Sequence, residues 1–151
     1  MRIISGNSKG KKILEPKDIK TRPLKDLTKE SIFNILNHSN KFKVDLENSN
    51  ILDLFSGVGS FGIECLSRGA KYVVFAEIYD GVLPVLKKNL QSLKSVENYE
   101  ILEKDIYDIN FLKSLDKKFD IVFMDPPYKD KDINFLLTTK LFLKFFFFKL
   151  S

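Results

Sequence analysis

Short apolar runs alternate with helix-like segments along the middle of the chain. Four runs have the length and character of buried strands: Ile51–Phe55, Tyr72–Ala76, Tyr99–Leu102 and Asp120–Met124. A helix is predicted from Ser60 to Arg68, where Gly69 terminates it. Strands that alternate with helices predict an α/β, Rossmann-like fold with a doubly wound, mostly parallel sheet. Ligands of such sheets bind at the carboxyl ends of the strands.

Further segments flank this alternating pattern. A β-hairpin arm and a helix over about Leu27–Asn37 are expected within an N-terminal unit, residues 1–40. A polar linker, His38–Asn50, leads into the core, residues 41–144. The core closes with one predicted helix, Asp130–Lys144.

The C-terminal tail, residues 145–151, has four consecutive Phe residues with lysines on either side. This run has neither strand alternation nor turn signals. A complete sheet of this kind should continue for about three more strands, so we interpret the chain as C-terminally truncated, with an uncovered sheet edge. We accordingly expect the product to be unstable or aggregated on its own, with little or no activity.

A glycine turn follows the first apolar run. Gly57, Gly59 and Gly62 form a G-x-G-x-x-G pattern, which allows the backbone to approach a ligand closely. Glu77 follows the second run at the point where an acid suits ribose hydroxyls, and Asp105 follows the third, where it suits an adenine amino group. These features predict an adenosine pocket, although both acids could instead be ordinary solvated loop residues. The candidate cofactor-binding residues are Asp53, Phe55, Gly57, Gly59, Glu77, Ile78, Asp105 and Ile106.

The same pocket lacks a phosphate-binding pattern. The sequence has no G-x-x-x-x-G-K-[ST] motif, and Asp53 lies beside the glycines, where it would repel a pyrophosphate. An acidic neighbour suits a positively charged ligand instead. S-adenosyl-L-methionine, with its sulfonium and amino groups, therefore fits this pocket and NAD fits it poorly.

The motif Asp125-Pro126-Pro127-Tyr128 follows the fourth apolar run and provides the candidate catalytic residues. Each proline fixes φ and donates no backbone hydrogen bond, so nearby carbonyls are free to bind something else. Asp125 and the Pro126 carbonyl could accept the two hydrogens of an exocyclic amine, while Tyr128 stacks on the attached base. Acceptors on both N–H bonds help to direct the amine lone pair at an electrophilic methyl group. The alternative is a proline-rich turn without a catalytic role.

Positive charge is concentrated at the N-terminus. The net charge of the chain is +5, and residues 1–29 contain nine Lys or Arg residues against three acids, so the rest of the chain is close to neutral. A basic arm before a neutral body indicates contact with a phosphate backbone, although a merely solvated basic segment is the alternative. The candidate RNA-binding residues are Arg2, Lys9, Lys11, Lys12, Lys20 and Arg22.

The single cysteine and single histidine exclude other classes of protein. Cys65 cannot form an internal disulfide, and one Cys with one His cannot make a metal cluster, so no metal site is predicted. Cys65 is expected in the core and His38 at a helix end. The N-terminus does not resemble a signal peptide, and the Phe-rich tail is too short and too charged to span a membrane. A reducing, cytoplasmic location follows.

The motifs together resemble the bacterial 16S ribosomal RNA guanine-N2 methyltransferase family, whose members are small class I methyltransferases. The resemblance extends from Met1 to about Tyr128 and rests on Met1-Arg2-Ile3-Ile4-Ser5-Gly6, Lys9-Gly10, Thr21-Arg22-Pro23, Asp26, Lys29-Glu30-Ser31, Phe33-Asn34-Ile35-Leu36, Asp53 to Gly59, Leu66 to Ala70 and the Asp-Pro-Pro-Tyr motif. The chain departs from the family at Leu27 and Lys29, near positions where arginines are usual. It also has Tyr79 in place of a second acid, and Pro84 within a predicted helix.

The resemblance implies methyl transfer from S-adenosyl-L-methionine to the N2 amine of a guanine, by a monomer that acts on 16S ribosomal RNA or the small ribosomal subunit. Asp-Pro-Pro-Tyr alone does not separate this target from adenine N6 in DNA or RNA, or from a glutamine amide in a protein. The Thr21-Arg22-Pro23 segment favours ribosomal RNA. The remaining alternative is an inactive truncated product that at most binds nucleic acid.

Overall fold

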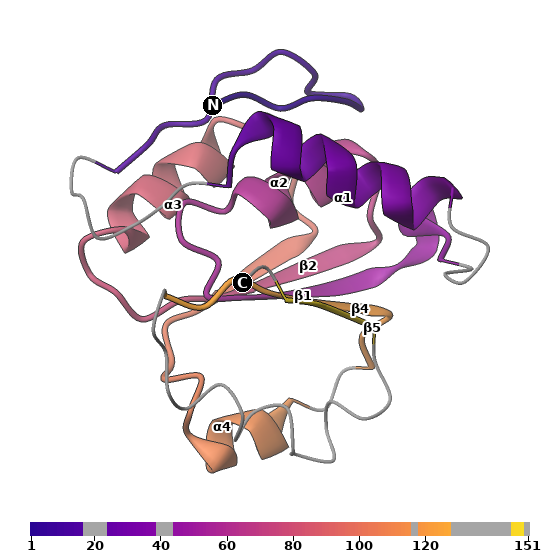
Figure 1. The fold of residues 1–151 in the computed structure, drawn as a ribbon. Helices are drawn as coiled ribbons and strands as arrows, with labels where there is room; N and C mark the ends of the chain where they lie inside the picture. The colour runs from indigo at the N-terminus through magenta and orange to yellow at the C-terminus, as the bar shows by residue number, and fades with distance from the viewer. Residues whose placement is uncertain (17–23, 39–43, 116–117, 128–145, 150–151) are drawn as a thin grey trace.

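The computed structural model of the protein describes residues 1–16, 24–38, 44–115, 118–127 and 146–149 (Figure 1). Three candidate site residues, Lys20, Arg22 and Tyr128, lie outside this part of the chain. The helix expected over Asp130–Lys144 also lies outside it.

The core is a sheet of five strands in the order β3-β2-β1-β4-β5, and every neighbouring pair is parallel. The strands are β1 (Asn50–Leu54), β2 (Tyr72–Ala76), β3 (Tyr99–Leu102), β4 (Ile121–Met124) and β5 (Phe146–Lys149). The predicted α/β class and the four predicted strands are therefore confirmed. β1 ends at Leu54, one residue earlier than expected, because Phe55 takes a left-handed conformation with φ of 57°.

Helices cover both faces of the sheet (Figure 1). The described helices are α1 (Asp26–His38), the short 3₁₀ helix η1 (Leu46–Asn48), α2 (Ser60–Ser67), α3 (Leu83–Gln91) and α4 (Ile109–Ser114). In Figure 1, α1, α2 and α3 lie on one side of the sheet and α4 lies on the other. Successive strand residues point to opposite faces, so Ile51 packs in the first layer while Leu52 packs in the second. Burial on both faces explains why the strands read as continuous apolar runs.

The N-terminal segment forms a minimal β-hairpin, shorter than a regular two-stranded ladder. Around the antiparallel bridge between Arg2 and Lys12, the Ile3 N–H donates to the Lys11 carbonyl (2.9 Å) and the Ile13 N–H donates to the Met1 carbonyl (3.0 Å). Ile3 and Ile13 are each 1% exposed, so the segment is held by packing against the helix layer. Gly6, with φ of 81°, allows the close approach, because a Cβ there would lie 1.8 Å from the Ser67 carbonyl oxygen.

The Phe-rich tail pairs with the sheet. Phe146–Lys149 forms β5, which is parallel to β4 with Phe146 opposite Ile121. The expectation that this run lacks a strand, and leaves β4 uncovered, is therefore wrong. Aromatic residues favour the strand conformation, and strands of parallel sheets need no apolar–polar alternation.

Smaller expectations are largely confirmed. Cys65 is fully buried and His38 is the last residue of α1. Pro84 lies in the first turn of α3, where a missing N–H costs no helical hydrogen bond. The N-cap of α3 is Val82, whose N–H donates to the Tyr79 carbonyl (3.0 Å) in a turn before the helix.

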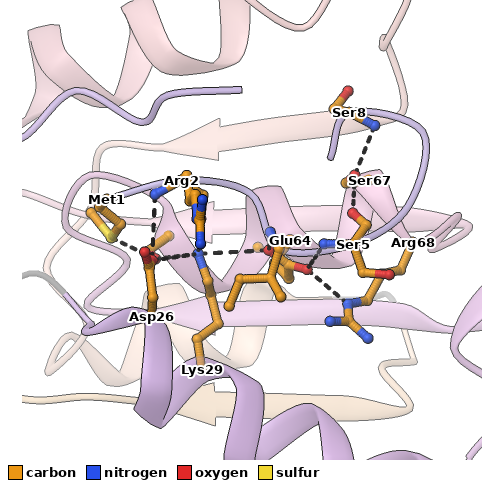
Figure 2. Close-up of polar contacts among 12 residues, drawn as sticks. Met1, Arg2, Ser5, Ser8, Asp26, Lys29, Glu64, Ser67 and Arg68 are labelled. Atoms are coloured by element: carbon orange, nitrogen blue, oxygen red, sulfur yellow. Dashed lines mark hydrogen bonds and ion pairs between the residues drawn. The ribbon is translucent and has the colours of Figure 1, made fainter. Parts of the chain in front are cut away.

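A buried ionic network fixes the N-terminal segment to α1 and α2 (Figure 2). Lys29 and Glu64 have fully buried side chains, and Lys29 Nζ lies 3.6 Å from Glu64 Oε2. Lys29 Nζ also donates to the Arg2 carbonyl (2.7 Å), and Glu64 accepts from the Ile4 N–H (2.8 Å) and from Arg68 Nε (2.9 Å). Lys29 is therefore not part of the basic surface, although the sequence analysis counted it there.

Two opposing effects act on the pKa of Lys29. Burial lowers the pKa of the Lys29 ammonium below its usual value, and the nearby carboxylates of Glu64 and Asp26 partly oppose this shift. An ammonium group in this place is tolerated because it has acceptors on several sides. Removal of Lys29 would leave Glu64 with Arg68 as its remaining ion-pair partner, and removal of Glu64 would leave Lys29 with the half-exposed Asp26.

We expect Lys29→Met to lower the free energy of unfolding by roughly 3 kcal/mol, because the buried Glu64 carboxylate keeps only Arg68 as a counter-ion and the Arg2 carbonyl loses its donor. The matched control is Lys87→Met, which breaks the exposed Lys87–Glu103 pair and should cost less than about 1 kcal/mol. Urea denaturation of both variants measures the difference. Equal losses would mean that the buried pair does not hold the N-terminal segment.

Candidate active site

The carboxyl ends of β1, β2, β3 and β4 lie level with one another. Leu54 pairs with both Ala76 and Met124, and Ala76 pairs with Leu102. The residues that follow these strands therefore share one edge of the sheet, and they are Phe55, Glu77, Glu103 and Asp125. The structure thus brings Glu77 and Asp125, predicted from separate motifs, to the same edge.

The glycine turn connects β1 to α2 at this edge. Gly57 and Gly59 have φ of 55° and 83°, and Gly59 is the N-cap of α2. A Cβ at Gly59 would lie 2.6 Å from Leu86 Cδ1, so close packing against α3 also requires glycine there. The turn presents backbone, and not side chains, at its glycines, as the sequence pattern indicated.

Glu77 holds the glycine turn in place. One carboxylate oxygen, Oε2, accepts from the Gly57 N–H (2.8 Å). The other, Oε1, accepts from the N–H groups of Ile78 and Tyr79 (2.9 Å each). Glu77 is only 9% exposed, which excludes the reading as an ordinary solvated loop acid. Its structural role was not apparent from the sequence, where nothing links Gly57 to an acid twenty residues later.

Asp53 lies on β1 beneath the glycine turn and is 1% exposed. Its Oδ2 accepts from the Gly62 N–H at 3.0 Å, near the start of α2. Burial raises the pKa of the Asp53 carboxyl well above its usual value, Asp125 and Glu77 raise it further, and the Gly62 hydrogen bond opposes them. Asp125 and Glu77 thus disfavour the ionised form of Asp53, and a cationic ligand would offset this repulsion.

Asp125 follows β4 and is partly buried, with Pro126 and Pro127 after it. Burial raises the pKa of the Asp125 carboxyl to about 6. The carboxylate form is then predominant at neutral pH but is lost in mild acid. A perturbed acid at the carboxyl edge of a parallel sheet is typical of a functional site.

The remaining predicted cofactor residues occupy different environments. Asp105 is exposed, and its Oδ1 accepts from the Tyr107 N–H (2.9 Å). Ile106 is 3% exposed and packs in the layer next to α4, whereas Ile78 is 54% exposed. The Phe55 ring lies 5.8 Å from the Tyr107 ring, centroid to centroid. Tyr107, two residues after Asp105, is not among the candidate residues predicted from the sequence, because nothing in the local pattern shows that its ring lies beside that of Phe55.

The predicted basic residues that the structure describes are on the surface. Arg2, Lys9, Lys11 and Lys12 are all exposed. They lie on the N-terminal segment, outside the layer formed by α1, α2 and α3 (Figure 1). Within the described residues, no helix is long and apolar enough to cross a membrane.

Comparisons with known proteins agree with this geometry. Residues 1–143 match the family model described as "Conserved hypothetical protein 95". A protein of Haemophilus influenzae named "Ribosomal RNA small subunit methyltransferase D" is 41% identical over 131 residues, which cover 85% of this chain and 64% of that protein. The protein of the same name from Escherichia coli K12 is 33% identical over 129 residues, 85% of this chain and 61% of that protein. The chain thus spans slightly less than two thirds of these two relatives.

The fold is that of methyltransferases. The solved structure described as "Putative methyltransferase yhhF from Escherichia coli" superposes with a TM-score of 0.70 at 32% identity, covering 87% of this chain and 66% of that one. The resemblance inferred from the sequence motifs is therefore confirmed. The chain belongs to the family described as "Conserved hypothetical protein 95".

Proposed function

We propose that this protein transfers a methyl group from S-adenosyl-L-methionine to the exocyclic N2 amine of a guanine in 16S ribosomal RNA. One observation carries the proposal: Glu77 and Asp125 follow neighbours of the same central strand, at one edge, beside the glycine turn. The names of the relatives from Haemophilus influenzae and Escherichia coli support a ribosomal RNA target.

The acids and the glycine turn fit S-adenosyl-L-methionine. This cofactor supplies an electrophilic methyl group on a positively charged sulfur. Glu77 Oε2 accepts from the Gly57 N–H of the glycine turn and can also accept from a ribose hydroxyl, whereas Oε1 already accepts from the Ile78 and Tyr79 N–H groups. The carboxylates of Asp125 and Glu77 give the site negative character, and Asp53, whose pKa they raise, would ionise more readily beside a sulfonium. Asp105, at the next strand end, suits the adenine amino group.

Asp125 is suited to hold the target amine. An aryl amine is a weak nucleophile, because its lone pair is delocalised into the ring. The Asp125 carboxylate and the Pro126 carbonyl can accept hydrogen bonds from the two N–H groups of the amine. These bonds direct the lone pair of the amine nitrogen at the methyl group. A carboxylate with a pKa of about 6 can also take the proton that the amine releases after methylation. We assign the stacking of the guanine to Tyr128 on the basis of the sequence motif.

The RNA backbone is assigned to the basic N-terminal segment. Arg2, Lys9, Lys11 and Lys12 are exposed there and can contact phosphates, and we add Lys20 and Arg22 from the sequence. Contacts of this kind position a substrate without reading its sequence. An amino methyltransferase acting on adenine N6 or on a protein glutamine remains the second candidate, because the Asp-Pro-Pro-Tyr motif would serve either amine.

The nature of the methylated product tests the proposal. Incubation of unmodified 16S ribosomal RNA with the protein and the cofactor, followed by nucleoside mass spectrometry, should yield N2-methylguanosine. We expect Asp125→Asn to lower the rate roughly a hundredfold or more, because the lost carboxylate holds the target amine. Affinity for S-adenosyl-L-homocysteine, which has the adenosine but no sulfonium charge, should stay within about threefold. Glu97→Gln, a change at an exposed acid, is the matched control and should keep full activity.

The pH profile gives a second readout of Asp125. The ionised Asp125 carboxylate is a stronger hydrogen-bond acceptor than the protonated acid. We therefore expect kcat/KM to fall as the pH drops through about 6. N6-methyladenosine as the product would favour the second candidate. Full activity of Asp125→Asn would remove Asp125 from the mechanism.

We expect Glu77→Ala to weaken S-adenosyl-L-methionine binding about ten- to a hundredfold, because a charged acceptor is worth roughly 1.5–3 kcal/mol. Calorimetric titration measures this change. Glu103→Ala is the control, since Glu103 follows the neighbouring strand β3 but is exposed and pairs with Lys87. Equal effects of both substitutions would show that general negative charge, and not Glu77 itself, holds the cofactor.

A further inference from the structure

Asn89, on α3, joins two segments that are far apart in the sequence. Its Nδ2 donates to the carbonyls of Val58 (3.0 Å) and Leu14 (3.1 Å), and its Oδ1 accepts from the Leu14 N–H (2.8 Å). Val58 lies between Gly57 and Gly59 in the glycine turn, and Leu14 lies on the N-terminal segment. One planar amide group, 3% exposed, therefore fixes the turn and the segment relative to each other.

The opposite side of the N-terminal segment is fixed to α2. Glu64 accepts from the N–H groups of Ile4 (2.8 Å) and Ser5 (2.9 Å). Ser67 Oγ donates to the Ser5 carbonyl (2.6 Å) and accepts from the Ser8 N–H (3.0 Å), as Figure 2 shows. Since α2 begins directly after Gly59 and Asn89 of α3 donates to the Val58 carbonyl, both anchors of the segment lead to the glycine turn.

The Asn89 contacts leave little freedom for independent movement. Its two Nδ2 hydrogens serve two different carbonyls, so a shift of the Val58 carbonyl must turn the amide or break a buried hydrogen bond. A turn of the amide displaces both hydrogen bonds to Leu14. A ligand that fixes the glycine turn thus also fixes the Leu14 backbone, although it does not touch it.

We infer that Asn89 is a positioning residue that couples cofactor binding at the glycine turn to order in the N-terminal segment. The identities of the cofactor and of the RNA bound by this segment rest on the proposed function. Through this coupling, a protein loaded with cofactor presents Arg2, Lys9, Lys11 and Lys12 on a more rigid segment. If bound cofactor raises the affinity for RNA by some factor, thermodynamic linkage requires that bound RNA raises the affinity for the cofactor by the same factor.

Amide hydrogen exchange at Leu14 tests the coupling. S-adenosyl-L-homocysteine, the demethylated cofactor, is the probe, and calorimetry first establishes that it binds. Saturation with this probe should slow exchange of the Leu14 amide at least about threefold in the wild-type protein. In Asn89→Ser, which is too short to bridge Val58 and Leu14, this response should be lost.

Leu90→Val is the matched control for Asn89→Ser. Leu90 is the next residue of α3 and is buried in the core, so its truncation destabilises the same helix while the Asn89 bridge stays intact. General stabilisation by a ligand would slow exchange equally in both variants. Loss of the Leu14 response in Asn89→Ser alone would therefore support the coupling, whereas a response in both variants would overturn it.

The outcomes also separate this inference from the proposed function. Binding of the probe without slower Leu14 exchange in the wild-type protein would overturn the coupling and leave the proposed function standing. Absence of probe binding would overturn both. If Asn89→Ser does not fold, the wild-type protein is compared at two amides, Leu14 and Leu112 of α4, which bonds to the Asp108 carbonyl on the other side of the sheet. Slower exchange at Leu14 alone would support the coupling, and equal slowing at both amides would overturn it.

Discussion

The level carboxyl ends of four parallel strands are the constraint on which the site depends. The register that sets Leu54 opposite Ala76 and Met124 places Glu77 and Asp125 on either side of the glycine turn. Burying these acids is costly: burial raises the pKa values of Asp53 and Asp125, and the carboxylates of Asp125 and Glu77 raise that of Asp53 further. Backbone N–H groups of Gly57, Ile78, Tyr79 and Gly62 offset part of this cost.

Polar groups in the rest of the core also have hydrogen-bond or ion-pair partners. Lys29, Glu64 and Asn89 are buried, and each bonds to backbone of the N-terminal segment. Within the described residues, no buried side-chain nitrogen or oxygen lacks a partner. These groups specify where the segment docks, because an apolar contact alone would not fix its register. The basic surface and the glycine turn thus rest on one connected framework.

The sequence predicted what depends on local pattern. Apolar runs located β1 to β4, because buried strands require apolar residues. The glycines and the helix after them located the turn, because a tight turn with positive φ favours glycine. It could not reveal the partners of Lys29 or Asn89, since a buried lysine or asparagine looks like a surface residue until the distant acceptor is known. Phe146–Lys149 was misread because a parallel strand needs no alternation. The turn-holding role of Glu77 likewise depends on a neighbouring strand.

The central claim is that this acidic edge selects an adenosine ligand that carries positive charge. The most direct measurement is calorimetric titration of the protein with S-adenosyl-L-methionine and, in parallel, with NAD. The account predicts saturable binding of S-adenosyl-L-methionine and binding of NAD that is weaker by at least about a hundredfold, because the pyrophosphate of NAD would meet Asp53, Glu77 and Asp125. NAD binding of equal or greater strength would contradict it.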